Sequence, residues 1–149
     1  MSVMNWHRHV GGAIPEMRAI ATCVRIGHGC VVWDFARILP GVVIGDDVSI
    51  GGGTVIGKGT VIGDRTRVGA NVFLPSHCSI GADVFIGPGT VCTDDRHPVA
   101  GNTNYEADPP VICKGASIGA GCILLPGVVI GERARVAGRG GGSGPRPRA

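Results

Sequence analysis

Aromatic and charged residues are scarce in this sequence, and long apolar runs are absent. Phe, Trp and Tyr make up 4% of its 149 residues and charged residues 17%, against roughly 25% charged in an average soluble domain. No apolar stretch of roughly 18 residues occurs, so no transmembrane helix and no membrane partner are expected. Residues 1–9 are polar and lack the apolar core of a signal peptide, which predicts a cytoplasmic protein.

Excess charge of one sign is also nearly missing. The formal net charge is +3, and Arg139, Arg146 and Arg148 alone supply as much. The body of the chain is therefore close to neutral, and no nucleic-acid partner is expected. The six cysteines include no CxxC pair, and none is paired with histidine at zinc-finger spacing. No metal is therefore expected.

An aliphatic residue recurs at every sixth position over most of the chain. From Ile14 to Cys92, all positions but the last hold Ile, Val or Leu, a run that chance does not produce. The series resumes in a new phase from Ile112 to Val136. Its first part consists of Ile14, Ile20, Ile26, Val32, Ile38, Ile44, Ile50, Ile56, Ile62, Val68, Leu74, Ile80, Ile86 and Cys92.

Other positions of this six-residue unit, the hexad, are also restricted. The residue after the aliphatic is usually one of the 27 glycines. Three after it stand mostly Gly, Asp, Asn or His, the types that best tolerate a left-handed backbone conformation. Four after it stands a small or β-branched residue. Cys30, Cys78 and Cys122 occupy this last position and Cys92 an aliphatic one, which predicts that these cysteines are small buried hydrophobic residues.

A hexad made of one short strand and one corner accounts for all these restrictions. An α-helix needs a period of 3.6 residues and excludes so much Gly, while a plain strand alternates by two. Three hexads close a triangular coil of about 18 residues. The sequence therefore predicts an all-β fold, a parallel β-helix of about six triangular coils. The repeat alone does not give the hand of this helix.

Three segments lie outside the repeat. Residues 1–13 are expected to form an N-terminal cap or arm, followed by the β-helix over residues 14–138. Residues 139–149 are rich in Gly, Pro and Arg and are expected to be a disordered tail. Residues 93–111 break the phase of the repeat and must leave the coils as one protruding loop. Long loops on compact scaffolds often carry function.

The hexads over residues 14–137 resemble those of the left-handed β-helix acyltransferases of the hexapeptide-repeat family, and left-handedness is expected from this resemblance. Residues 31–51, VVWDFARILPGVVIGDDVSIG, look like the start of nucleotide-linked amino-sugar N-acetyltransferases. Residues 93–99, TDDRHPV, are similar to the loop of maltose and galactoside O-acetyltransferases, in which a His-Pro supplies the catalytic histidine. Acetyl-CoA is the co-substrate that this resemblance implies.

The resemblance also implies the catalytic residues. His97 takes the role of general base, with Asp94 or Asp95 to orient its ring, and Asn71 contacts the acetyl group or the acceptor amine. Plainer interpretations stay open, because His97 is also an ordinary loop histidine and Asn71 stands at a corner that favours asparagine.

Binding residues complete the expected site. Trp33 replaces the usual glycine of its hexad and is expected to stack on a nucleotide base or to fill a subunit contact. Small side chains at coil edges match positions where the family contacts the pantetheine arm, although the hexad itself also favours them. The expected substrate-binding residues are Trp33, His77, Asp94 and Asp95, and the expected cofactor-binding residues are Ala116, Gly119, Ala120 and Gly138.

One position of the hexad predicts an oligomer. Five residues after each aliphatic, the side chain is expected to point outward. Val55, Phe73 and Val91 stand at this position in successive coils, and an outward apolar column of this kind predicts a protein partner. The family forms trimers with active sites at subunit boundaries, so the resemblance implies a homotrimer.

The leading hypothesis is an acetyl-CoA-dependent N-acetyltransferase acting on a small-molecule acceptor, a nucleotide-linked amino sugar. The His97-Pro98 pair favours an alternative, an O-acetyltransferase of a simple sugar or other small hydroxyl compound. A second alternative is a non-catalytic β-helix scaffold subunit. A zinc-dependent β-helix carbonic anhydrase is disfavoured, because no third histidine follows His77 and His97.

Overall fold

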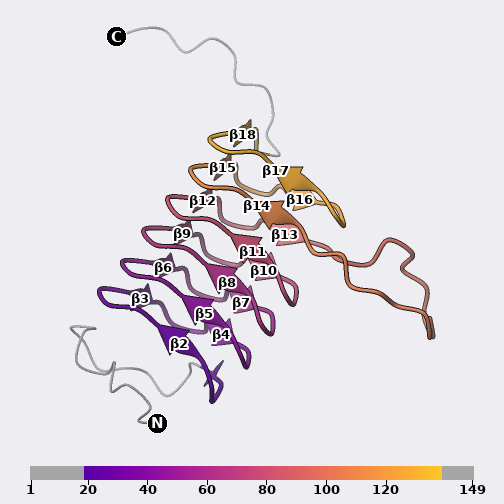
Figure 1. The fold of residues 1–149 in the computed structure, drawn as a ribbon, viewed down its shortest axis with the longest axis horizontal. Helices are drawn as coiled ribbons and strands as arrows, with labels where there is room; N and C mark the ends of the chain where they lie inside the picture. Colours follow the sequence, from indigo (N-terminus) through magenta and orange to yellow (C-terminus); the bar gives the residue numbers. More distant parts are fainter. Residues whose placement is uncertain (1–18, 139–149) are drawn as a thin grey trace, which may run out of the picture.

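The computed structural model describes residues 19–138, which form a left-handed parallel β-helix with one protruding loop (Figure 1). Short two-residue strands lie on three six-stranded parallel sheets, the faces of a triangular prism. The predicted fold of about six triangular coils is confirmed. The expected N-terminal cap, the first residues of the repeat and the C-terminal tail lie outside the described residues.

We call the three sheets faces A, B and C, in the order in which the chain visits them. Face A holds β1 (Ala19–Ile20), β4 (Arg37–Ile38), β7 (Val55–Ile56), β10 (Phe73–Leu74), β13 (Val91–Cys92) and β16 (Ile123–Leu124). Face B holds β2 (Arg25–Ile26), β5 (Val43–Ile44), β8 (Val61–Ile62), β11 (Ser79–Ile80), β14 (Val111–Ile112) and β17 (Val129–Ile130). Face C holds β3 (Val31–Val32), β6 (Ser49–Ile50), β9 (Arg67–Val68), β12 (Phe85–Ile86), β15 (Ser117–Ile118) and β18 (Arg135–Val136). Corners AB, BC and CA are the segments that join consecutive faces.

Each coil lies in register on the next through backbone hydrogen bonds. Phe73 stands opposite Val55 of the preceding coil and Val91 of the following coil. The N–H of Val55 donates to the carbonyl of Val72 at 2.9 Å, and the same bond recurs from coil to coil. Residues 93–110 bulge out at corner AB, yet Ser79 still pairs with Val111 beyond them. The insertion therefore leaves the stack of coils intact.

The aliphatic residue of each hexad points into the prism. Ile38, Ile56, Leu74 and Ile86 are fully buried, each in line with its counterparts in the neighbouring coils. The residue four after the aliphatic is buried too, as in Val42, Val72 and Val84. The predicted burial of four cysteines is confirmed, and none is in a disulfide; these are Cys30, Cys78, Cys92 and Cys122.

Corner residues adopt the left-handed conformation that the sequence predicts. Asp47, Asn71, His77 and Asp83 have φ between +54° and +62°. The structure adds residues of other types at this position, including Phe35 with φ of 62°. The glycine after the aliphatic has a different cause: a Cβ on Gly57 would overlap the backbone of the next coil, so close stacking rather than φ requires glycine there.

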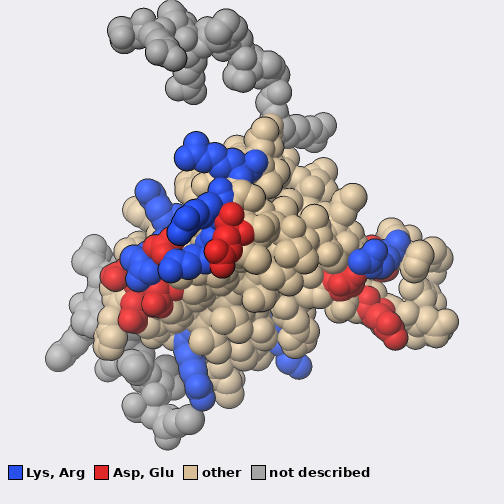
Figure 2. All heavy atoms as spheres, turned by 45° about the horizontal axis from the view of Figure 1, so that its top comes forward, with Lys and Arg blue, Asp and Glu red and all other residues tan. Residues whose placement is uncertain are grey.

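Corner BC carries most of the charge of the prism, as Figure 2 shows along one edge. The N–H of Asp46 donates to Oδ1 of Asp64 at 2.9 Å, so a carboxylate of one coil accepts from the coil before it. Arg65 donates to Asp83 from Nε at 2.7 Å and from Nη2 at 3.1 Å. This bidentate hydrogen bond lowers the pKa of Asp83, although both side chains lie at the surface.

Buried threonine hydroxyls connect neighbouring coils inside the corners. Oγ1 of Thr66 donates to the carbonyl of Gly81 at 2.8 Å and accepts from the N–H of Val84 at 3.2 Å. Thr66 and Thr90 are both fully buried, but among the described residues Oγ1 of Thr90 has a single hydrogen bond, to the carbonyl of Gly119 at 3.3 Å. The Thr66 hydroxyl therefore satisfies a backbone N–H and a backbone carbonyl, whereas the Thr90 hydroxyl satisfies a carbonyl.

Thr66→Val is expected to lower the free energy of unfolding by about 1–3 kcal/mol, because it leaves the buried N–H of Val84 without an acceptor. Urea unfolding followed by circular dichroism measures this change. Thr90→Val is the matched control and should lose less stability, since no N–H of residues 19–138 donates to the Thr90 hydroxyl. Equal losses in the two variants would contradict this account.

Candidate active site

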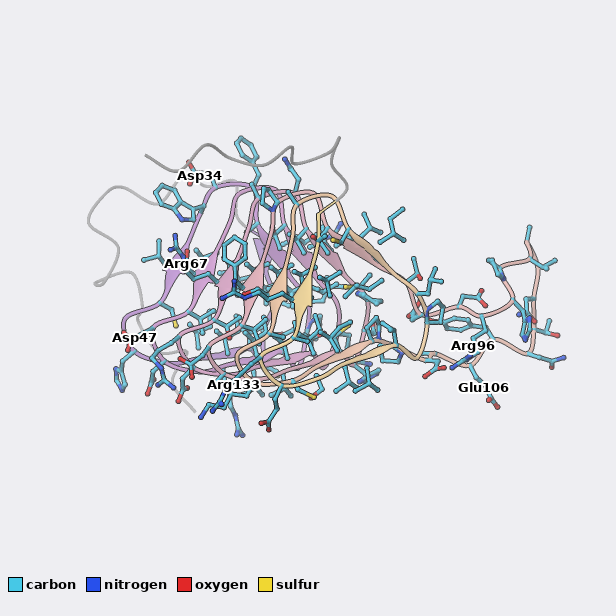
Figure 3. The ribbon with its side chains drawn as sticks, turned by 90° about the horizontal axis from the view of Figure 1, so that it is seen from above. Asp34, Asp47, Arg67, Arg96, Glu106 and Arg133 are labelled. Atoms are coloured by element: carbon cyan, nitrogen blue, oxygen red, sulfur yellow. The ribbon has the colours of Figure 1, made fainter. Side chains whose placement is uncertain are left out.

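The loop at corner AB contains the predicted general base. Residues 93–110 leave the prism after β13 and return at β14, and the arm projects well away from the coils (Figures 1 and 3). His97 is exposed on this arm, where its N–H donates to Oδ1 of Asp95 at 2.8 Å. The side-chain amide of Asn102 donates to the His97 carbonyl at 3.4 Å. The backbone of His97 is thus held from both sides, while its imidazole is left available.

A hollow of about 400 Å³ opens beside His97 within the arm. Its lining is strongly polar and consists of Asp95, Arg96, His97, Asn102, Asn104, Glu106, Ala107 and Asp108. Arg96 pairs with Asp108 at 2.5 Å. Asp95 and Glu106 therefore give the hollow two carboxylates beyond the one that Arg96 neutralises.

The structure gives Asp94 and Asp95 partners other than the His97 ring. The hydroxyl of Tyr105 donates to Oδ2 of Asp94 at 2.6 Å, and Asp95 accepts from the backbone of His97. The hydrogen bond to the Asp94 carboxylate raises the pKa of Tyr105 to about 12, because that bond stabilises the protonated hydroxyl. Among the described residues, the His97 imidazole has no hydrogen-bond partner.

His77 lies on corner AB one coil before the loop. Because β13 pairs with β10, the arm leaves directly beyond the corner that carries His77. The side chain is exposed, and its ring lies where a Cβ on Gly59 would stand. Its N–H donates to the carbonyl of Lys58 at 2.8 Å. His77 therefore belongs to the same side of the molecule as His97.

Corner CA, at the other edge of face A, brings together most of the remaining predicted residues. Asn71 is exposed there, with the Oδ1 atom of its side chain over Gly53 of the preceding coil. Trp33, 58% exposed, stands at the same corner near the first coil. Towards the last coil, Gly138 stacks on Gly119 and Ala120, leaving no space for a side chain at position 119.

Ala116 lies apart from these residues. It is fully buried at the end of corner BC, where its N–H donates to Cys113 and its carbonyl accepts from Phe85. A second hollow, about 240 Å³, lies between corner CA and face C, lined by Phe85, Ser117, Ile118, Gly119, Arg135 and Val136. Gly119 is the predicted cofactor residue that borders it.

The predicted residues thus form two groups on different corners. His77, Asp94, Asp95 and His97 share corner AB, and the others except Ala116 share corner CA. The sequence marks the insertion, but it does not indicate which of its residues pair or line the hollow, above all Arg96, Tyr105, Glu106 and Asp108. Those residues obey no repeat, so no register predicts their neighbours.

No metal cluster is found in residues 19–138, and two buried thiols are held in their protonated form. No three His, Cys, Asp or Glu side chains are grouped there so as to hold a metal ion, and no helix in this range could cross a membrane. Burial raises the pKa of both Cys78 and Cys92 to about 12, so these thiols stay protonated near neutral pH.

The repeats of the chain match a known family. Residues 23–58 and 59–94 each fit the sequence profile described as bacterial transferase hexapeptide (six repeats). The resemblance predicted from the hexads is thereby confirmed. No curated protein gives a significant sequence match.

Several solved structures share the fold. The acetyltransferase domain of PglB from Neisseria gonorrhoeae is 20% identical, with a TM-score of 0.69 over 83% of this chain and 52% of that one. A mutant perosamine N-acetyltransferase from Caulobacter crescentus, in complex with CoA and GDP-perosamine, is 22% identical, with a TM-score of 0.56 over 83% of this chain and 49% of that one. The chain thus spans about half the length of these structures.

The burial of the thiols leads to a prediction of their reactivity. In the folded protein at pH 8, iodoacetamide is expected to alkylate the exposed Cys23 and to spare Cys78 and Cys92, because only the thiolate reacts. Peptide mass spectrometry measures the modified fraction, and alkylation in urea is the control in which all cysteines react. Native alkylation of Cys78 as fast as that of Cys23 would refute the assignment.

Proposed function

We propose that this chain, whose repeats match the bacterial transferase hexapeptide family, is an acetyl-CoA-dependent N-acetyltransferase acting on a nucleotide-linked amino sugar. The observation that carries the proposal is His97, held by its backbone on an arm of the prism beside a hollow lined with carboxylates. Support comes from the perosamine N-acetyltransferase, which shares the fold and was solved with CoA and GDP-perosamine.

His97 is the proposed general base. Acetyl-CoA supplies an acetyl group activated as a thioester. During transfer an N–C bond forms, the C–S bond breaks, and the proton lost by the amine ends on the CoA thiol. The His97 imidazole, without a hydrogen-bond partner among the described residues, is free to take up that proton and release it. Asn71 is proposed to donate a hydrogen bond to the acetyl oxygen as negative charge develops on it.

The charge of the hollow favours an amine over a hydroxyl acceptor. An amino sugar carries a positive charge near neutral pH until it loses its proton, whereas a sugar hydroxyl is neutral. Asp95 and Glu106 line the hollow in excess of the Arg96–Asp108 pair and so attract a cation. This is the reason for placing N-transfer ahead of O-transfer.

Corner CA fits the CoA moiety. Gly119, Ala120 and Gly138 present little more than backbone there, so a pantetheine arm can lie close against the edge. The adjacent hollow offers the Phe85 ring and the Arg135 side chain, an apolar surface and a positive charge. Trp33, further along the same corner, is proposed to stack on the base of the nucleotide-linked acceptor.

A homotrimer would unite the two corners. Within one chain, corners AB and CA are separated by the whole of face A, so a hydrogen bond cannot join His97 to Asn71. We propose a cyclic trimer in which corner AB of one chain lies against corner CA of the next. Face A supports such a contact, because its outward residues Phe73, Val91 and Ile123 are apolar and exposed.

We place the protein in the cytoplasm, where acetyl-CoA is available and free cysteines are maintained.

Release of CoA from acetyl-CoA tests the proposed function. With a panel of nucleotide-linked amino sugars, free amino sugars and simple glycosides, turnover is expected for a nucleotide-linked amine. His97→Ala should lower kcat by about 10²- to 10⁴-fold, because the base is lost. His28→Ala, an exposed histidine at corner BC, is the matched control and should keep the wild-type rate.

Other outcomes of this assay have distinct meanings. If only glycosides were turned over, the protein would be an O-acetyltransferase rather than an N-acetyltransferase. Turnover that survives His97→Ala would remove His97 as the base. Absence of both turnover and acetyl-CoA binding would overturn the proposed function in favour of a scaffold subunit.

Mixed trimers test whether His97 and Asn71 act together across a subunit boundary. Asn71→Gly removes the side chain without strain at its positive φ and, like His97→Ala, should be nearly inactive alone. Trimers co-expressed from both variants should regain about a quarter of wild-type activity, because random assembly joins an intact loop to an intact corner CA in that share of sites. Activity is measured on the total co-expressed protein, with homotrimers and mixed trimers together. No recovery would show that both residues serve one chain's own site.

A further inference from the structure

The neck of the arm is fastened to the coil beyond it. The N–H and Oγ1 of Thr93 both donate to the carbonyl of Leu124, at 2.9 and 3.0 Å. The N–H of Gly127 donates to the carbonyl of Asp108 at 2.7 Å, and the N–H of Asp108 donates to the carbonyl of Asp94 at 2.8 Å. These backbone bonds hold only the two ends of the arm. From residue 95 to residue 107, the described structure gives one further backbone bond, from Asn102 to Val99.

Two side-chain pairs join the outgoing half of the arm to the returning half. Arg96 donates from Nε to Asp108, and Tyr105 donates from its hydroxyl to Asp94. Each pair links residues 11 or 12 positions apart in the sequence. His97 follows directly after Arg96, and its own N–H is bound by Asp95. Figure 3 shows Arg96 on the projecting arm, away from the labelled residues of the prism.

Stability of the prism does not account for these pairs. The Arg96 and Asp108 side chains are 60% and 40% exposed, and exposed ion pairs contribute little to the free energy of unfolding. The coils keep their register on both sides of the insertion without help from the arm. What the pairs do fix is the path of the arm, since each one removes conformations that an open loop of this length would visit.

Gly127 shows that the next coil leaves room for one of these pairs. Its φ is +70°, and a Cβ at this position would meet Nη2 of Arg96 and Oδ2 of Asp108. The bare corner at Gly127 thus accommodates the ion pair directly beside the backbone bond that fastens the arm. A side chain there would displace the pair without changing any charge.

We infer that Arg96–Asp108 and Tyr105–Asp94 are positioning pairs that hold His97 at a fixed place relative to the prism for acetyl transfer. This inference rests on the proposed function. A general base acts only within hydrogen-bond reach of the proton that it removes, so a displacement of about 1 Å lowers the rate strongly. None of the four side chains needs to contact the substrate for this role.

Single substitutions in the full-length protein test the inference. Arg96→Gln, Tyr105→Phe and Gly127→Ala should each lower kcat by about 10- to 100-fold, with the KM for acetyl-CoA nearly unchanged. Their pH–rate profiles should keep the ascending limb that His97→Ala loses, because the base is present but misplaced. Arg65→Gln is the matched control: it breaks an exposed Arg–Asp pair at corner BC and should keep the wild-type kcat.

A second measurement does not depend on activity. Tyr105 is the single tyrosine of the chain, so the ultraviolet absorbance of tyrosinate reports its ionisation alone. Its midpoint should lie near pH 12 in the wild type and fall toward the ordinary value of about 10 in Asp94→Asn. Circular dichroism recorded in parallel confirms that the coils stay folded during the titration.

The outcomes separate this inference from the proposed function. An active wild type whose Arg96→Gln and Tyr105→Phe variants keep kcat within twofold overturns the inference alone, as does an equal loss in Arg65→Gln. A Tyr105 midpoint that Asp94→Asn leaves unchanged also overturns it. A wild type that acetylates no acceptor overturns the proposed function, and the positioning role with it, even where the titration shows that the pair exists.

Discussion

The parallel backbone hydrogen bond between one coil and the next is the constraint on which the whole molecule depends. Because it recurs at every strand and corner, each residue stands over its counterpart in the neighbouring coil. Aliphatic side chains then stack into one continuous core, and buried threonine hydroxyls hydrogen-bond to backbone groups of the corners. The close approach of coils also dictates composition. Glycine is favoured after the aliphatic because a Cβ at most of these glycines would overlap the next coil, and the third residue after the aliphatic must accept a left-handed backbone whatever its type.

This constraint explains how much the sequence predicts. The spacing of Ile56, Leu74 and Cys92 was enough to predict a triangular coil, a buried column and buried cysteines, all of which the structure shows. Only the hand of the helix needed the family resemblance. Phe35 was not predicted at a left-handed corner, since the stack imposes that conformation on a residue that avoids it elsewhere. The pairing of Arg96 with Asp108 cannot be predicted from the sequence, because the arm follows no repeat and its contacts depend on its own path.

The division of the candidate site follows from the same geometry. A prism with three equivalent corners offers three edges along which ligands or other chains can lie, and the chain uses them differently. Corner BC carries acidic and basic side chains, including the Arg65–Asp83 pair, corner CA is nearly free of side chains over several coils, and corner AB carries the insertion. The proposed chemistry needs a base from one edge and a smooth surface from another. Under the proposed function, assembly rather than folding alone would complete the site.

The attachment of the arm has a consequence for how the protein responds to heat. In a solenoid, each repeat is stabilised by its immediate neighbours, so unfolding begins by fraying at the ends and proceeds one repeat at a time. The carbonyl of Leu124 and the amide of Gly127, which fasten the arm, belong to the last coil that the structure describes. Local unfolding of that coil would release the arm while the preceding coils remain folded, so the position of His97 depends on the stability of one coil rather than on that of the whole prism.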